Sequence, residues 1–127
     1  MSYFTARTVE GDFDAVVERT RAALQKHGFG VLTEIDVQAT LKVKIGQEFR
    51  PYRILGACNP VMAHEALLME PHVGVMLPCN VVVQQAEAGV EVFAIDPAAS
   101  MSAIDNPALL HHARAVGELL NAAVADV

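Results

Sequence analysis

The stretch Pro-Tyr-Arg-Ile-Leu-Gly-Ala-Cys-Asn-Pro, from Pro51 to Pro60, decides how the middle of this 127-residue chain folds. Apolar residues occupy both alternating sets of positions from Tyr52 to Cys58, which is typical of a strand inside a sheet. Asn59 and Pro60 indicate a helix start, because asparagine caps a first turn and proline there loses no needed hydrogen bond. The stretch therefore predicts an interior strand that runs into a capped helix, which must end before Pro71.

Alternating and helical patterns on the N-terminal side predict four further elements. They are a strand over 3–9, a helix capped by Asp12 and closed by Gly28, a strand over 29–35, and a short helix over 37–45 between Asp36 and Gly46. The β-branched residues of 37–45 leave a strand there as the competing interpretation.

Patterns on the C-terminal side predict a long strand, a hairpin partner and a final helix. The long strand covers 73–85 and contains Pro78, which implies a bulge or a sheet edge there. Its partner covers 90–95, and an irregular connection over 97–105 leads to a helix begun by Asn106 and Pro107. This order predicts a single α+β domain of β-α-β4-α order. Its mostly antiparallel sheet has about five strands, with two main helices packed on one face and short extra helices.

Composition restricts the classes of function. Apolar residues make up 53% of the chain and charged residues 19%, so we expect apolar surface to remain after the core is filled, and we expect a homodimer. The net charge of −6 and the lack of a basic run argue against nucleic-acid binding. We see no signal peptide and no membrane span, and expect a cytoplasmic protein with reduced thiols.

The two cysteines are the first candidates for chemistry. Cys58 ends the predicted interior strand, and Cys79 lies in the next one. If those strands are neighbours, the two thiols can meet near one end of the sheet and form a reversible disulfide or share a soft metal. The alternative is that both are small buried hydrophobes. Adding His64 and His72 does not produce the close ligand pairs of a zinc site, so we predict no structural zinc site from these four residues and name no metal ligands.

Asparagine follows each cysteine. Asn59 is explained as a helix cap, whereas Asn80 within a strand needs a hydrogen-bond partner, either backbone or a ligand. Tyr52 flanks the same motif, and Glu34 belongs to a charged cluster that a solvated face with ion pairs also explains. The candidate ligand-binding residues are therefore Cys58, Cys79, Asn59, Asn80, Tyr52 and Glu34.

With these motifs in hand, the chain resembles the family called domain of unknown function 302. The matching stretches are Gly28 to Asp36, Ala39 to Lys42, Pro51 to Pro60, Leu77 to Val81, and Asp96-Pro97. The resemblance implies the β-α-β4-α arrangement of the TATA-binding-protein type and implies no activity. It also implies that both Cys-Asn pairs belong to the family pattern, whereas the fold analogy to a DNA binder carries no functional weight.

Three functions remain open from the sequence, and it identifies no cofactor. The first is a module that binds a small molecule, a thiol or a metal around Cys58 and Cys79. The second is a non-catalytic homodimeric structural or interaction protein whose motif serves folding. The third is an enzyme with a cysteine nucleophile and His64 or His72 as its base, although no known nucleophile motif is present.

Overall fold

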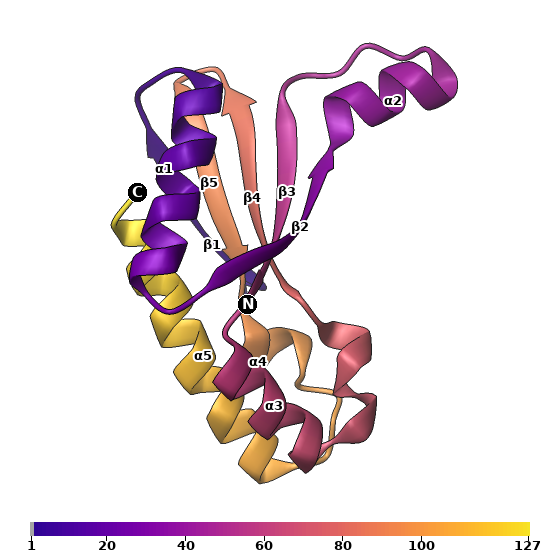
Figure 1. Cartoon of the computed structure of the whole chain (residues 1–127), viewed down its shortest axis with the longest axis vertical. Helices are drawn as coiled ribbons and strands as arrows, with labels where there is room; N and C mark the ends of the chain where they lie inside the picture. The colour runs from indigo at the N-terminus through magenta and orange to yellow at the C-terminus, as the bar shows by residue number, and fades with distance from the viewer. Residues whose placement is uncertain (1) are drawn as a thin grey trace.

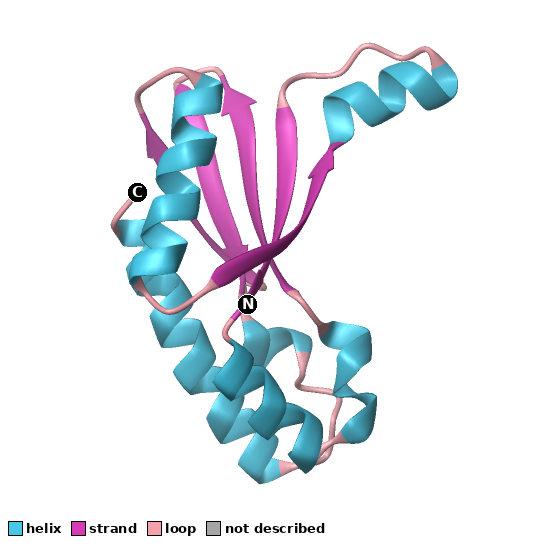
Figure 2. Cartoon of the chain, in the orientation of Figure 1, coloured by secondary structure: helices cyan, strands magenta, loops and turns pink. Residues whose placement is uncertain are grey.

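A computed structural model describes residues 2–127, and Figures 1 and 2 show a curved antiparallel sheet with two long helices along one face. The elements in chain order are β1 (Phe4–Val9), α1 (Phe13–Lys26), β2 (Gly30–Asp36), α2 (Val37–Ile45), β3 (Tyr52–Cys58), α3 (Pro60–Met69), the 3-10 helix η1 (Pro71–Met76), β4 (Cys79–Ala86), β5 (Gly89–Ile95), α4 (Pro97–Ser100) and α5 (Pro107–Ala125). The predicted α+β class and its element order are confirmed.

The five strands lie in the order β1-β5-β4-β3-β2, and every neighbouring pair is antiparallel. Strand β3 is interior, as its apolar residues on both faces predict. Helices α1 and α5 contact each other and pack on one face of the sheet. Branched side chains of the central strands are fully buried there, against Val16 and Leu24 of α1 and Leu120 of α5.

The predicted helix starts are confirmed, and each follows the same chemistry. Asp12, Asp36, Asn59 and Asn106 each accept a hydrogen bond from the backbone N–H three residues ahead. That bond satisfies one of the N–H groups that the first helical turn leaves without a partner. The short helix after β2 also ends as predicted, because Gly46 takes a left-handed conformation, with φ of 67°.

The strand predicted over 73–85 is wrong in nearly its first half, residues 73–78. Residues 71–76 form η1, and β4 begins only at Cys79, so Pro78 lies before the strand and makes no bulge in it. The Glu70 carboxylate accepts from the His72 N–H at the start of η1, and Val73 is completely buried. Burial of Val73 in a second apolar cluster thus overrides the β propensity of the local sequence.

A second, smaller apolar cluster lies beyond the end of the sheet, in the lower part of Figure 1. Its buried residues come from α3, η1, the segment after α4 and the first half of α5; they are Ala66, Val73, Met101, Leu109 and Ala113. The connection predicted to be irregular over 97–105 contains the short helix α4, because Asp96 caps its first turn. Helix α5 joins the clusters, since its second half packs under the sheet.

Gly56 in β3 permits a close approach where the sheet meets the second cluster. A methyl group built on Gly56 would lie 2.1 Å from Thr33 Oγ1 and 2.7 Å from Pro78 Cγ. Any larger residue would push the segment before β4 away from β3. Glycine at this position therefore brings Pro78 and Cys79 against the end of β3.

Candidate ligand-binding pocket at the end of β3 and β4

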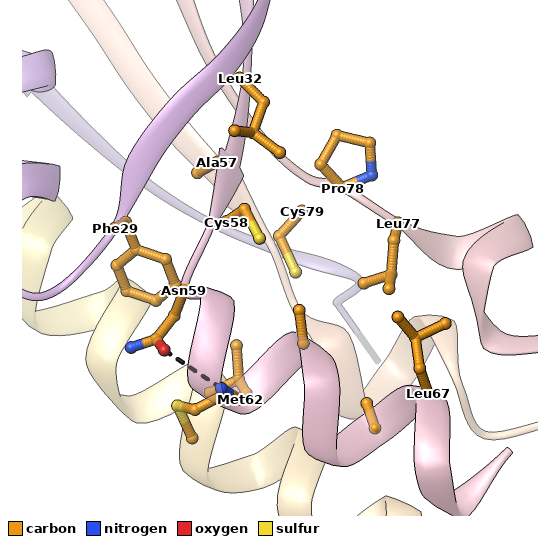
Figure 3. Close-up of a pocket in the computed structure, with 13 residues that line it drawn as sticks. Phe29, Leu32, Ala57, Cys58, Asn59, Met62, Leu67, Leu77, Pro78 and Cys79 are labelled. Atoms are coloured by element: carbon orange, nitrogen blue, oxygen red, sulfur yellow. Dashed lines mark hydrogen bonds between the residues drawn. The ribbon is translucent and has the colours of Figure 1, made fainter. Parts of the chain in front are cut away.

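A cavity of about 300 Å³ lies between the two apolar clusters, where β3 and β4 meet α3 (Figure 3). The end of β3, the start of β4 and the first turns of α3 form much of its wall, and α5 contributes Val116. Its lining residues are Phe29, Leu32, Ala57, Cys58, Asn59, Met62, Ala63, Ala66, Leu67, Leu77, Pro78, Cys79 and Val116. None of these thirteen described residues carries a charged side chain, so the pocket suits apolar contents.

Both cysteines line this pocket, and both are free thiols. The predicted neighbourhood of their strands is confirmed, but the register pairs Cys79 with Ala57, one residue before Cys58. The two cysteines are therefore not directly opposite each other in the sheet. Cys58 is half-buried at the end of β3, whereas Cys79 is buried at the start of β4 and belongs to the main core.

Burial changes the acidity of one thiol. Removal from water, with a smaller contribution from the nearby Cys58 thiol, raises the pKa of the Cys79 thiol to about 11. The apolar wall disfavours a thiolate, because no positive group compensates the charge there. At neutral pH Cys79 is thus a neutral, weakly polar part of the pocket wall.

Asn59 provides the amide group of the pocket. Its Oδ1 accepts a hydrogen bond of 3.1 Å from the Met62 N–H, as the helix-cap prediction requires. Within the described residues its Nδ2 has no recorded hydrogen bond, and Figure 3 draws that nitrogen beside the ring of Phe29. The capping role therefore holds the side chain in place and leaves one N–H₂ group able to donate.

The structure separates the other predicted site residues from this pocket. Asn80 is exposed and lies opposite Gly56 in the register, and it lines a different cavity with Val75 and Ser100. Tyr52 stands at the far end of β3, where its ring contacts Phe93 and Phe49.

Glu34 takes part in a charge network under α1. Its Oε2 accepts from Arg53 Nη1 at 2.9 Å, and its other oxygen pairs with Arg21. Arg53 also lies within 3.7 Å of Asp36 and 3.6 Å of Asp14. Ion pairs between β2, β3 and α1 thus account for Glu34, as the solvated-face interpretation predicted.

Most of the pocket wall was missed by the sequence prediction. Met62, Ala63, Ala66 and Leu67 recur at helical spacing after Asn59, so one face of α3 was the available signal. Leu77 and Pro78 belong to the stretch Leu77 to Val81 that matches the family. Phe29, Leu32 and Val116 carry no local signal, because only the packing of distant segments brings them to this place.

Neither histidine considered for catalysis or metal binding reaches the pocket. His64 is exposed on α3, and the His72 ring, 94% exposed, pairs with Glu70. Across residues 2–127 no group of three or more His, Cys, Asp or Glu side chains is placed to hold a metal ion. In the same residues no helix has the length and apolar character needed to cross a bilayer.

Comparison with known proteins assigns the chain to a family. The family described as "Domain of unknown function DUF302" matches residues 5–127, so the chain belongs to it, and the sequence resemblance is confirmed. A solved structure, "Crystal structure of uncharacterized conserved protein DUF302 from Bacillus stearothermophilus", is similar with a TM-score of 0.94 and 28% sequence identity. The match covers 99% of this chain and 98% of that one. No curated protein matches the chain.

Proposed function

We propose that this protein is a binding module for a small, uncharged and largely apolar ligand, held between β3, β4 and α3. The observation that supports this proposal is the pocket of about 300 Å³, whose wall contains two thiols and one amide among otherwise apolar side chains. This volume lies at the lower end of the range of small-molecule sites, and a few polar groups in an apolar wall are typical of them. The two Cys-Asn motifs supply three of the lining residues.

The amide of Asn59 gives the ligand one expected polar feature. Its oxygen is engaged at the first turn of α3, and its Nδ2, which lies next to Gly28 and Phe29, is the remaining donor for a ligand at that margin of the pocket. A carbonyl or hydroxyl oxygen on the ligand would accept this hydrogen bond and fix its orientation. The surrounding leucine, methionine and proline side chains favour an apolar remainder.

Two finer functions receive less support from the same site. A metal ion requires a set of ligands close together, and in residues 2–127 no three His, Cys, Asp or Glu side chains are placed to supply one. A cysteine nucleophile requires a nearby base, and neither His64 nor His72 lines the pocket. Binding of an uncharged ligand, with Cys58 and Cys79 as parts of the pocket wall, therefore fits the lining side chains best.

Binding of 1-naphthol and of 1-naphthoate at pH 7 tests the proposal, because they differ mainly in charge. We expect 1-naphthol to shift backbone amide resonances of residues 57–63 and 77–79 in NMR titrations, and naphthoate to bind at least about tenfold more weakly for want of a cationic partner. Absence of shifts in these residues with 1-naphthol up to about 1 mM, a Kd at the weak limit of specific binding, contradicts the proposal.

Two matched variants test whether the ligand binds in this pocket. Ala63→Phe adds an aromatic ring inside it and is expected to weaken 1-naphthol binding at least about tenfold. Ala122→Phe makes the same change on the exposed side of α5 and is expected to leave binding unaltered. Equal binding by wild type and Ala63→Phe would place the ligand elsewhere and refute the assignment.

A further inference from the structure

The sheet face opposite α1 and α5 carries a continuous aromatic stripe. Alternation along β4 and β5 sends the buried valines to the helices and sends Phe93 to the other face. Contacts between rings, with centroids 5.1 to 6.4 Å apart, link five aromatic side chains one after another: Tyr3, Phe4, Phe93, Tyr52 and Phe49. Helix α2 and its loop extend beyond one end of this side of the sheet (Figure 1), and η1 and α4 lie beside Asn80 and Ile95 at the other end. Five of the chain's seven aromatic residues thus lie along this face and its margin.

Residues 37–50 form an arm that projects from the same margin, as Figure 1 shows at its upper right. The arm consists of α2 and the loop that leads to β3. None of the nine residues of α2, all within the described range, is buried, and Val43 and Ile45 are 82% and 64% exposed. A helix of this length is marginal in water without tertiary packing. The arm therefore presents apolar residues with little support from the rest of its own chain.

The arm also differs from the rest of the chain in charge. Residues 37–50 contain Lys42, Lys44 and Arg50 against the single acid Glu48, a formal charge of +2. Within the chain's total of −6, the remaining residues carry −8. A basic arm on an acidic body is complementary to a second copy of that body, and Glu91 places an acid on the open face itself.

We propose that two copies of this chain associate with the arm of each packed on the aromatic face of the other. A two-fold axis makes the contact reciprocal, so α2 of each copy packs on the stripe of the other, while Phe49 and Arg50 at the base of the arm stay on Tyr52 of their own chain. Val43 and Ile45 supply apolar contacts to the stripe. Lys44 approaches the acidic body, together with Lys42, which pairs with Glu48 of its own arm at the surface. The pocket at the opposite end of β3 is not part of this contact, so the two proposals stand or fall separately.

Sedimentation equilibrium of the full chain between about 1 µM and 1 mM, the usual range of weak to moderate protein affinities, tests this proposal. We expect a concentration-dependent rise from 13.6 kDa to twice that mass. The variant Val43→Asp/Ile45→Asp is expected to raise the dimer dissociation constant about thirtyfold or more, as loss of a central apolar contact does. Val75→Asp, at an 84% exposed position on η1, is the control and is expected to have no effect.

Two further readouts separate this contact from general adhesion. Lys42→Glu/Lys44→Glu is expected to weaken association at least about tenfold at low salt and less at high salt, since screening removes the attraction. Hydrogen exchange in α2 is expected to slow as the dimer forms. A wild-type chain that stays monomeric at 1 mM overturns the proposal and leaves the face for a different partner, and so does a dimer that survives Val43→Asp/Ile45→Asp.

Discussion

Helices α2 and α3 begin alike and end in different environments. Each follows a strand directly, and each starts at a side chain that caps its first turn, Asp36 for α2 and Asn59 for α3. Only α3 then packs: its Ala66 is buried, and its carbonyls at Met62 and Met69 accept hydrogen bonds from side chains of α5. Capping therefore determines where a helix begins, whereas the surface available to it determines whether it becomes part of the core.

The wall of the pocket depends on this difference. Helix α3 turns back under the end of the sheet beside Ala57 and Cys79, which are both buried, whereas Leu32 and Leu67 line the open side of the pocket. Helix α2 follows β2, its loop enters β3 at the opposite end, and its apolar residues stay exposed. The two ends of one strand thus carry the two features that we assign to function.

The largest difference between the two helices is expected in the free energy of unfolding, when one apolar side chain is truncated at each. Leu109→Ala removes a fully buried side chain from the cluster that holds α3 and is expected to lower the free energy of unfolding by about 2–5 kcal/mol. Ile45→Ala in α2 is expected to cost less than about 0.5 kcal/mol when the chain is dilute. Urea unfolding measures both. A similar loss in the two variants would mean that the arm is packed in the monomer.

The next effect concerns the water-excluded thiol beneath α3. Folding raises the pKa of Cys79 from 9.0 to about 11, so the folded state retains its proton over that range and the unfolded state loses it. This contribution to stability is complete below pH 9 and is expected to fall by roughly 2 kcal/mol as the pH rises to 11.

Cys79→Ala isolates this contribution, because other groups also titrate at alkaline pH. The wild type is expected to lose more stability than the variant between pH 9 and 11, by urea unfolding at each pH. Parallel curves of unfolding free energy against pH for the two proteins would mean that Cys79 is solvated in the folded state.

The smallest effects are expected at the two caps, where the chemistry is the same. Asn59→Ala is expected to reduce global stability by about 1 kcal/mol, because α3 cannot fray without opening the second cluster. Asp36→Ala breaks an equivalent bond, yet α2 can unfold by itself, so we expect faster hydrogen exchange in residues 37–45 with little global change. Equal losses of global stability would show that α2 unfolds together with the sheet.

Local signals were sufficient for much of the fold. The caps at Asp12, Asp36, Asn59 and Asn106, and the left-handed turn at Gly46, act within a few residues, so the sequence around each one identified it. The same holds for the interior strand from Tyr52 to Cys58 and for the hairpin of β4 and β5.

Part of the candidate site was equally accessible. Cys58, Asn59 and Cys79 do line one pocket, as the repeated Cys-Asn motif indicated. Helical spacing after Asn59 was a signal for the lining residues of α3, although the sequence prediction missed them. These predictions needed only the neighbourhood of the two strands.

Tertiary structure alone decided what lies around those elements. Residues 71–76 have the composition of a strand, but burial of Val73 beside Leu109 makes them a 3-10 helix. Asn80 directly follows Cys79, yet the pleat of β4 turns it to the opposite face, and Tyr52 belongs to the motif of Cys58, yet the length of β3 puts it at the other end of the strand. By itself the sequence determined where elements begin and which groups they carry. Contacts between distant residues decided which groups meet, because burial free energy depends on neighbours that no local pattern specifies.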